Sequence, residues 1–185
     1  MKQAICSFIY YKILGWKAKV SVPDFDKCII CAAPHTTNWD LIIGKLFISA
    51  VGRESGFMMK KEWFFFPLGI LFRWMGGIPV HRDKHTSLVD QVIKQVKASD
   101  KFHLAITPEG TRSPNPNWKK GFYYIALGAN IPIVLIGIDY EKKCITAEKY
   151  IMPSGDIDKD IREIKLYFKD FKGRHPHKFD LGNID

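Results

Sequence analysis

Short apolar runs alternate with amphipathic stretches along most of this chain. An apolar run of about 4–8 residues is typical of a buried strand, whereas apolar residues at steps of three and four indicate a helix with one buried face. We therefore predict strands at residues 28–33, 56–60, 77–82, 102–107, 131–140 and 144–151, and helices at 39–51, 86–99, 119–129 and 156–172. This alternation predicts an α/β fold, a single domain with a mostly parallel central sheet flanked by helices.

Two of the predicted helices have recognisable starting residues. Asn38 precedes 39–51 and is a candidate N-cap. Ser87 and Asp90 have the spacing of a capping box at the start of 86–99. That helix has one apolar face, made of Leu88, Val89, Val92, Ile93 and Val96.

The charge and the aromatic residues point to an anionic surface as a partner. The net charge of +9 favours nucleic acid, a phosphorylated small molecule or an anionic membrane. Aromatic residues concentrate in 60–77, where two lysines precede an apolar stretch that Pro67 and Arg73 interrupt. The interruption excludes a membrane-spanning helix here. Aromatic rings beside lysines are typical of an element that lies at headgroup depth, and a buried core helix is the alternative.

The first 22 residues repeat this mixture of lysines and aromatic residues. Residues 1–20 contain no acidic residue, no small-residue cleavage site follows them, and Lys12 divides their apolar part. A secretory signal is therefore not expected. We interpret residues 1–22 as a basic and aromatic membrane-associating N-terminus and expect peripheral or monotopic attachment at the cytoplasmic face of the cell membrane.

The whole chain, 1–185, is predicted to form one domain. Its 46% hydrophobic content is enough to bury a core without disulfides or metal. After the N-terminus we expect a core segment at 28–151, the helix at 156–172 and a polar, mobile tail at 173–185. The four cysteines lack the spacing of a disulfide framework, and no second pair accompanies the C-x-x-C at 28–31. We expect reduced thiols and no metal site.

Candidate chemistry begins with the sequence "APHTTNWD", residues 33–40. Three of the six histidines have an aspartate five residues later, so the spacing of His35 and Asp40 alone decides nothing. His35, however, follows a predicted strand directly, and open α/β sheets build their sites at the carboxyl ends of strands. His85 with Asp90 precedes a helix where the aspartate fits a capping role, and His175 with Asp180 lies in the polar tail.

His35 and Asp40 can meet only if the chain turns between them. Residues five apart on one helix point about 140° apart. A loop that holds His35, followed by Asp40 in the first helical turn, would let the carboxylate fold back to the imidazole. The carboxylate would keep one ring nitrogen protonated and leave the other as a base.

The target of this base is predicted to be a substrate hydroxyl. The sequence contains no G-x-S-x-G elbow that would supply a serine nucleophile, and nothing around Cys31 indicates a lowered thiol pKa. Removal of a proton from an acceptor alcohol, which then attacks an activated acyl carbonyl, requires a base and its orienting group.

A second loop, "TPEGTRS" at 107–113, also follows a predicted strand. Gly110 allows close backbone approach, Thr111 and Ser113 offer hydroxyls, and Arg112 can contact a phosphate in bidentate fashion. Arg82, at the end of 77–82, is a further phosphate-binding candidate. Glu109 could brace Arg112, accept a hydrogen bond from a glycerol hydroxyl or have a purely structural role.

Together these stretches resemble the motif blocks of the glycerophospholipid acyltransferase family, which contains the 1-acylglycerol-3-phosphate acyltransferases. The blocks are His35 to Asp40, "GIPVHR", "PEGTRS" and "IPIVLI", in family order from Pro34 to Ile136. The resemblance implies that a fatty acyl chain is transferred from acyl-CoA or acyl carrier protein to a lysophospholipid hydroxyl. It implies reaction at the cytoplasmic membrane surface, with no metal and no further cofactor. It also implies His35 as the base, Asp40 as its partner, and an acceptor-binding set of Arg82, Glu109, Gly110, Thr111 and Arg112.

The sequence departs from the family pattern at a few positions. Pro34 stands where many members have asparagine, Pro79 replaces a bulky residue, Thr107 replaces a common phenylalanine, and "IPIVLI" lacks a second proline. Pro79 and Thr107 lie where the acceptor pocket is expected. 1-Acylglycerol-3-phosphate, giving phosphatidate, is the main hypothesis, and another lysolipid or an acylated amino acid is the alternative acceptor.

A non-catalytic basic module that binds lipid or nucleic acid is the hypothesis from a different class. Such a module would not require His35, Asp40 and the Glu-Gly-Thr-Arg loop at strand ends. We therefore expect a lysophospholipid acceptor and a membrane surface as partners, and no nucleic acid.

Overall fold

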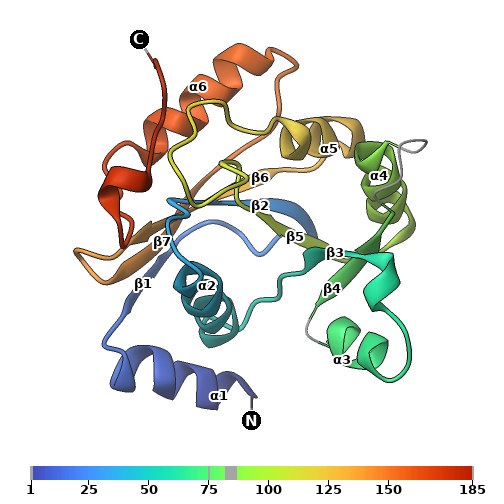
Figure 1. Ribbon diagram of the computed structural model, residues 1–185, viewed down its shortest axis with the longest axis horizontal. Helices are drawn as coiled ribbons and strands as arrows, with labels where there is room; N and C mark the ends of the chain where they lie inside the picture. The colour runs from blue at the N-terminus through green and yellow to red at the C-terminus, as the bar shows by residue number, and fades with distance from the viewer. Residues whose placement is uncertain (1, 75, 82–86, 185) are drawn as a thin grey trace.

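The computed structural model describes residues 2–74, 76–81 and 87–184 (Figure 1). Its elements in chain order are α1 (Lys2–Ser7), the π-helix η1 (Phe8–Ile13), β1 (Lys17–Val20), β2 (Lys27–Ala33), α2 (Trp39–Ala50), β3 (Phe57–Lys60), the 3-10 helix η2 (Lys61–Trp63), α3 (Leu68–Trp74), β4 (Gly77–Val80), α4 (Leu88–Ala98), β5 (Phe102–Ile106), α5 (Gly121–Ala129), β6 (Ile133–Asp139), β7 (Cys144–Ile151), α6 (Ile157–Phe168) and the 3-10 helix η3 (Pro176–Lys178). Each strand and helix predicted above is present, although the bounds differ by a few residues.

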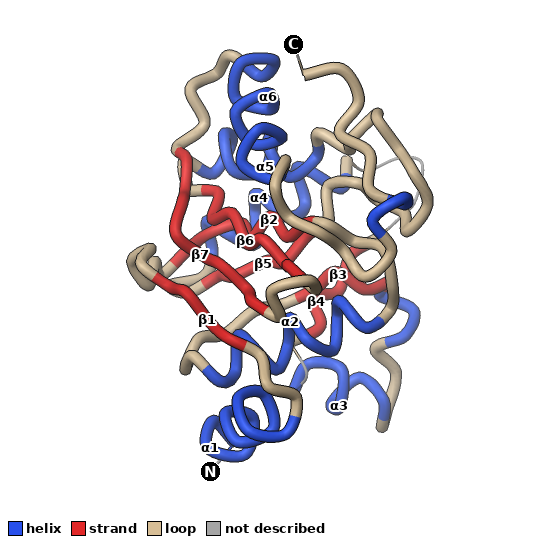
Figure 2. The backbone as a smooth tube through the Cα atoms, turned by 90° about the vertical axis from the view of Figure 1, so that its left-hand side faces the viewer, coloured by secondary structure: helices blue, strands red, loops and turns tan. Residues whose placement is uncertain are grey.

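The central sheet has five strands in the order β1-β7-β6-β2-β5. Its neighbouring strands run parallel except for β6 and β7, which are antiparallel. Helices α4, α5 and α6 lie on one side of the sheet, and α1 and α2 lie on the other, as Figures 1 and 2 show. The prediction of a mostly parallel central sheet flanked by helices is confirmed.

Alternation along the central strands divides the core in two. In β2, Ile29 and Cys31 pack in one apolar cluster with residues of α4, α5 and α6. Their neighbours Cys28 and Ile30 pack in the other cluster with Ile43 and other residues of α2. Successive side chains of a strand point to opposite faces, so a strand covered by helices on both faces is apolar at nearly every position.

The strands β3 and β4 form a separate parallel pair beside the main sheet. An isolated bridge between Gly56 and Leu104 joins this pair to β5. These two strands were predicted, but the sequence pattern carried no information on which sheet each would join. Arg82, predicted to end the 77–82 strand, lies outside the described residues.

The N-terminal 22 residues, predicted to associate with a membrane, take part in the sheet and the core. Residues 17–20 form β1, an edge strand parallel to β7, which the sequence reading missed. Tyr10, Trp16 and Val22 are buried in the core cluster that contains α2. The Tyr10 hydroxyl donates to the Lys17 carbonyl at 2.9 Å. Only one side of this segment is therefore available for another surface, where Ile5, Phe8 and Ile13 are exposed.

The segment 173–185, predicted as a polar and mobile tail, contacts the rest of the domain in its described part. The Trp118 indole donates to the Asp180 carbonyl at 3.1 Å, and Lys165 Nζ donates to the Leu181 carbonyl at 2.6 Å. Phe179 and Leu181 pack against the core cluster of α4, α5 and α6. The surface against which these two residues pack is formed by parts of the chain distant in sequence. The polar composition of the segment therefore gave no sign of the contacts.

Gly137 in β6 makes a close approach that yields a stability prediction. A Cβ added to Gly137 would overlap the ring of Phe171. We expect Gly137→Ala to lower the free energy of unfolding by about 1–3 kcal/mol, because overpacking forces side chains or backbone to shift. Gly44 in α2 is the matched control, since an added Cβ there meets nothing within 4 Å. Gly44→Ala should raise the free energy of unfolding by about 0.5–1 kcal/mol. Urea unfolding measures both, and equal effects of the two substitutions would contradict the prediction.

Candidate active site

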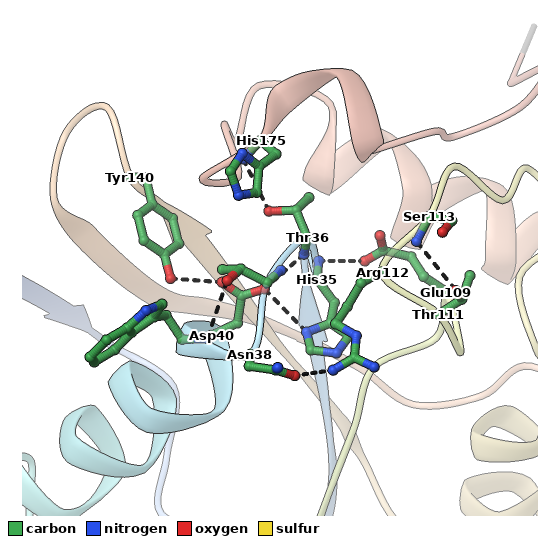
Figure 3. Close-up of polar contacts among 12 residues, drawn as sticks. His35, Thr36, Asn38, Asp40, Glu109, Thr111, Arg112, Ser113, Tyr140 and His175 are labelled. Carbon is green, nitrogen blue, oxygen red and sulfur yellow. Dashed lines mark hydrogen bonds and ion pairs between the residues drawn. The ribbon is translucent and has the colours of Figure 1, made fainter.

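The segment 34–38 turns between β2 and α2 and brings His35 and Asp40 together. His35 lies just beyond the carboxyl end of β2, and Asp40 lies in the first turn of α2. His35 Nδ1 is 3.1 Å from Asp40 Oδ2. The predicted pairing of these side chains through a turn is therefore present in the structure (Figure 3).

The Asp40 carboxylate accepts from four donors and is 3% exposed. Besides His35, the backbone N–H groups of Thr36 and Thr37 donate to Oδ2 at 2.7 and 2.9 Å. The Tyr140 hydroxyl donates to Oδ1 at 2.7 Å. A buried carboxylate needs such partners to compensate for lost hydration, and here they also fix its orientation.

The arrangement determines which ring nitrogen of His35 is available. A carboxylate only accepts hydrogen bonds, so Nδ1 carries the proton of this contact and Nε2 holds the free lone pair. The His35 side chain is 19% exposed, whereas that of Asp40 is 2% exposed. A base with an accessible nitrogen and a buried orienting carboxylate can remove a proton from a bound hydroxyl.

Glu109, beyond the carboxyl end of β5, contacts the same loop from the other side. Its Oε1 accepts from the His35 backbone N–H at 2.7 Å. The side chain is 1% exposed, and burial raises the pKa of its carboxyl to about 7, although the His35 N–H opposes this shift. Of the roles considered for Glu109, the described contacts favour the structural one, because it holds the backbone of the histidine loop.

Arg112 reaches the start of α2 rather than Glu109. Its Nη1 donates to Asn38 Oδ1 (Figure 3). Asn38 occupies the N-cap position of α2, but its side chain makes no capping hydrogen bond. The predicted N-cap position is therefore correct, although the Asn38 side-chain oxygen accepts from Arg112 instead of capping the helix.

The other predicted residues of the second loop shape its backbone. Gly110 has a φ of 68°, a left-handed conformation that favours glycine. The Thr111 hydroxyl accepts from the Ser113 N–H at 3.2 Å and is exposed. The structure thus brings His35, Asp40, Glu109 and Arg112 to one edge of the sheet. It does not describe Arg82.

An apolar cavity of about 510 Å³ opens beside His35 and Arg112. It runs between α2 and the face of the central sheet. The sheet residues that line it are apolar: Ile30, Ala32, Ala105, Ile106, Ile136 and Ile138. Its volume lies within the range of small-molecule pockets, and its apolar walls suit a hydrocarbon chain.

Tyr140 was not among the predicted site residues, whereas the prediction that the Cys31 thiol has no lowered pKa is consistent with the structure. Tyr140 directly follows β6, whose end is beside that of β2, so its position at a strand end was an available signal. Cys31 is fully buried, and burial raises the pKa of its thiol well above the usual value, with the nearby Glu109 adding to the shift. A thiol in that state is a poor nucleophile.

Comparison with known proteins decides the family of this chain. A family model described as Acyltransferase matches residues 18–139. The chain belongs to the acyltransferase family. This confirms the family resemblance recognised from the motif blocks, and all four blocks lie within the matched residues of this acyltransferase.

Two relatives give further detail. This acyltransferase is 31% identical over 149 residues to the 1-acyl-sn-glycerol-3-phosphate acyltransferase of Streptococcus pneumoniae (strain ATCC BAA-255 / R6). The match covers 78% of this chain but 54% of the relative, so the chain spans about half the length of that protein. Its fold is similar to the crystal structure of PlsC, the 1-acyl-sn-glycerophosphate (LPA) acyltransferase of Thermotoga maritima. That similarity has a TM-score of 0.56 and 14% identity and covers 92% of this chain and 81% of the other.

The raised pKa of Glu109 predicts a pH-dependent stability. Its carboxyl has an ordinary pKa of 4.5 and about 7 in the folded chain. Between pH 4.5 and 7 the folded state binds more protons than the unfolded state. The contribution of the Glu109 carboxyl to stability is therefore fully present below pH 4.5 and is lost as the pH rises through 7. Glu109→Gln should therefore gain stability relative to wild type between these pH values, with an upper limit on the order of 3 kcal/mol.

Urea unfolding of wild type and Glu109→Gln across this pH range measures the difference. The amide oxygen of glutamine can still accept from the His35 N–H, so the loop contact is retained. Two unfolding free energies that change in parallel with pH would show that Glu109 does not titrate as described.

Proposed function

We propose that this protein transfers a fatty acyl chain from an acyl thioester to the free hydroxyl of a lysophospholipid. The favoured acceptor is 1-acylglycerol-3-phosphate, and the product is then phosphatidate. The observation that carries the proposal is the pairing of His35 with a buried, fully hydrogen-bonded Asp40 at the mouth of an apolar cavity. The similarity to a protein named 1-acyl-sn-glycerol-3-phosphate acyltransferase supports the choice of acceptor.

The proposed chemistry is a proton-coupled acyl transfer. His35 Nε2 removes the proton of the acceptor hydroxyl as its oxygen forms a bond to the thioester carbonyl carbon. The positive imidazole is stabilised by Asp40, which the Thr36, Thr37 and Tyr140 donors hold in place. Collapse of the tetrahedral intermediate breaks the carbon–sulfur bond, and the proton passes from Nε2 to the departing thiolate. The products are an ester and a free thiol, so the reaction balances without a metal or a further cofactor.

Substrate binding is assigned by the chemistry of the lining groups. The acyl chain of acyl-CoA or acyl carrier protein would lie in the apolar cavity next to His35. Arg112 borders the same cavity and suits the phosphate of the acceptor. Gly110, Thr111 and Glu109 would form the loop that holds Arg112, and Arg82 completes the proposed acceptor-binding set on the strength of the family resemblance.

Peripheral attachment to the cytoplasmic face of the cell membrane is part of this proposal. Among the described residues, no helix combines the length and the apolar character required to cross a bilayer. Large apolar side chains are nevertheless exposed on α1, η1 and the segment around α3, including Phe8 at 60%, Phe66 at 83% and Ile70 at 65%. Exposed aromatic and aliphatic residues beside lysines suit the interfacial region of a bilayer. The acyl thioester, the lysophospholipid and the phospholipid product all carry acyl chains. An enzyme at the membrane surface is therefore close to its substrates and to the place where the product resides.

The first test is an acyl-transfer assay read by mass spectrometry. Purified wild type and His35→Ala receive acyl-CoA and acyl carrier protein donors with lysophosphatidate and other lysolipids. We expect a diacyl product from wild type and a loss of at least about 10³-fold in turnover in His35→Ala, because the base is removed. His177→Ala, a change of an exposed histidine in η3, should retain full activity.

Each result of this assay has a definite meaning. Full activity of a folded His35→Ala protein would exclude the proposed base. A product from a different lysolipid alone would replace the favoured acceptor, and absence of product from wild type with every pair would contradict the acyltransferase proposal itself.

Tyr140 is proposed as a positioning residue for the His35–Asp40 pair. Tyr140→Phe removes one hydrogen bond to a charged group, which is worth about 1.5 kcal/mol. We expect a decrease in kcat of about 10-fold with little change in KM, because Tyr140 contacts Asp40 and is not among the residues that line the apolar cavity. Tyr10→Phe is the control, since it also removes a tyrosine hydrogen bond, in this case to the Lys17 carbonyl and away from the site. A change in KM alone, or equal kcat losses in both variants, would argue against this role.

A further inference from the structure

A second cavity lies near the amino end of β5, on the side opposite to His35. Its volume is about 250 Å³. Five basic side chains line it, with one acidic side chain, and we refer to this cavity as the basic pocket. These residues are Lys2, Lys45, Arg53, Arg73, Lys101 and Glu54.

Among the described residues, the carboxylates near the basic pocket are fewer than its basic side chains. Asp24 pairs with Arg53 at 3.6 Å. Of the ion pairs formed within residues 2–74, 76–81 and 87–184, none includes Lys45, Arg73 or Lys101. The pKa of Lys45 is lowered, first by burial and then by the charge of Lys2; the carboxylate of Glu54 opposes this shift more weakly, which leaves a net repulsion between the cations. A bound anion would relieve that repulsion.

The position of the basic pocket indicates the origin of such an anion. It is lined by Lys2 of α1 and Arg73 of α3, and Figures 1 and 2 both show these helices side by side at one end of the molecule. The same helices bear exposed apolar residues, Ile5 on α1 and Ile70 on α3. A basic pocket lined by helices that also carry exposed apolar residues is complementary to the surface of an anionic bilayer, where phosphate groups lie just above the acyl region.

The basic pocket is separate from the proposed acceptor site. It adjoins the apolar cavity, and four residues line both: Lys45, Ile48, Ser55 and Gly56. Lys45 Nζ donates to the Ser55 carbonyl at 2.5 Å and so lies across the junction. His35 and Arg112 border the apolar cavity but not the basic pocket. A phosphate in the basic pocket would therefore not be the one that Arg112 is proposed to bind.

We propose that the basic pocket is a second phosphate-binding site, which takes the headgroup phosphate of an anionic phospholipid in the supporting membrane. Arg73 supplies a planar guanidinium for the phosphate oxygens, and Lys101 supplies a compact positive charge at the rim. This inference rests on the membrane attachment included in the proposed function. It adds to that function a dependence of attachment on the headgroups of the membrane.

Vesicle cosedimentation of purified protein tests the inference. Wild type and Arg73→Gln/Lys101→Gln are compared on phosphatidylcholine vesicles with and without phosphatidylglycerol, at about 0.15 M ionic strength. Both side chains are exposed, so the protein should fold, and its melting temperature verifies this. We expect the double variant to lose about 30-fold in affinity for the anionic vesicles and to equal wild type on neutral ones.

Lys12→Gln/Lys61→Gln is the matched control. It removes the same charge from exposed positions on η1 and η2, outside the basic pocket. Surface charges of this kind are screened by salt, so the control should lose only a few-fold in affinity. Equal losses in the two double variants would overturn the proposal, because they would show a general charge effect instead of a site.

Two further measurements separate the alternatives. In the first, millimolar inorganic phosphate is added at constant ionic strength, and wild type should stay bound to the anionic vesicles. Release of the protein would show that the pocket binds free phosphate and would overturn the lipid assignment. In neutral detergent micelles, Arg73→Gln/Lys101→Gln should transfer acyl chains at the wild-type rate, and a decreased rate would place the pocket in the catalytic site. If wild type itself shows no transfer, the proposed function fails, while the vesicle comparison still decides the fate of the basic pocket.

Discussion

The arrangement of this molecule around its candidate active site depends on the hydrogen bonds of one buried carboxylate. Asp40 accepts from the His35 ring, from two backbone N–H groups of the preceding loop and from the Tyr140 hydroxyl. These contacts join the end of β2, the start of α2 and the end of β6. A single carboxylate with four donors can therefore fix the histidine, the loop and the helix relative to one another, because each donor comes from a different direction.

Glu109 complements Asp40 from the neighbouring strand. It holds the backbone of His35, whereas Asp40 holds the ring. The two carboxylates lie in different environments: Asp40 is fully supplied with donors, while burial raises the pKa of Glu109 to about 7. The histidine is thus fixed at two points, and its Nε2 stays available at the entrance of the apolar cavity. That combination suits a base that acts on a substrate hydroxyl while a hydrocarbon chain lies in the protein.

Two cavities divide the face of the sheet that α2 covers. The apolar cavity begins at His35 and Arg112, and the basic pocket opens between α1 and α3. Lys45, which donates to the Ser55 carbonyl, lines both of them. Helices α1 and α3 lie at the same end of the molecule, as Figures 1 and 2 show. Both helices carry exposed apolar residues and line the basic pocket, so one membrane surface could engage both features. Chemistry and attachment would then use opposite ends of α2.

The sequence by itself determined the α/β class, the position of each predicted strand and helix, and the His35–Asp40 and Glu109–Arg112 loops. It could do so because strand and helix periodicities are local and because strand ends are recognisable from polar and glycine-containing loops. It missed β1, whose pairing partner is distant in the sequence, and it gave no sign that Phe179 and Leu181 pack against the core.

Only the tertiary structure decided which side chains meet. It placed Tyr140 on Asp40, moved Asn38 from a capping role to Arg112, and assigned Glu109 to the His35 backbone. It also paired β3 with β4 outside the central sheet and assembled the basic pocket from five segments of the chain. Each of these contacts joins residues distant in sequence, and the direction of a side chain across such a distance depends on the packing of the elements between them, which no local pattern encodes.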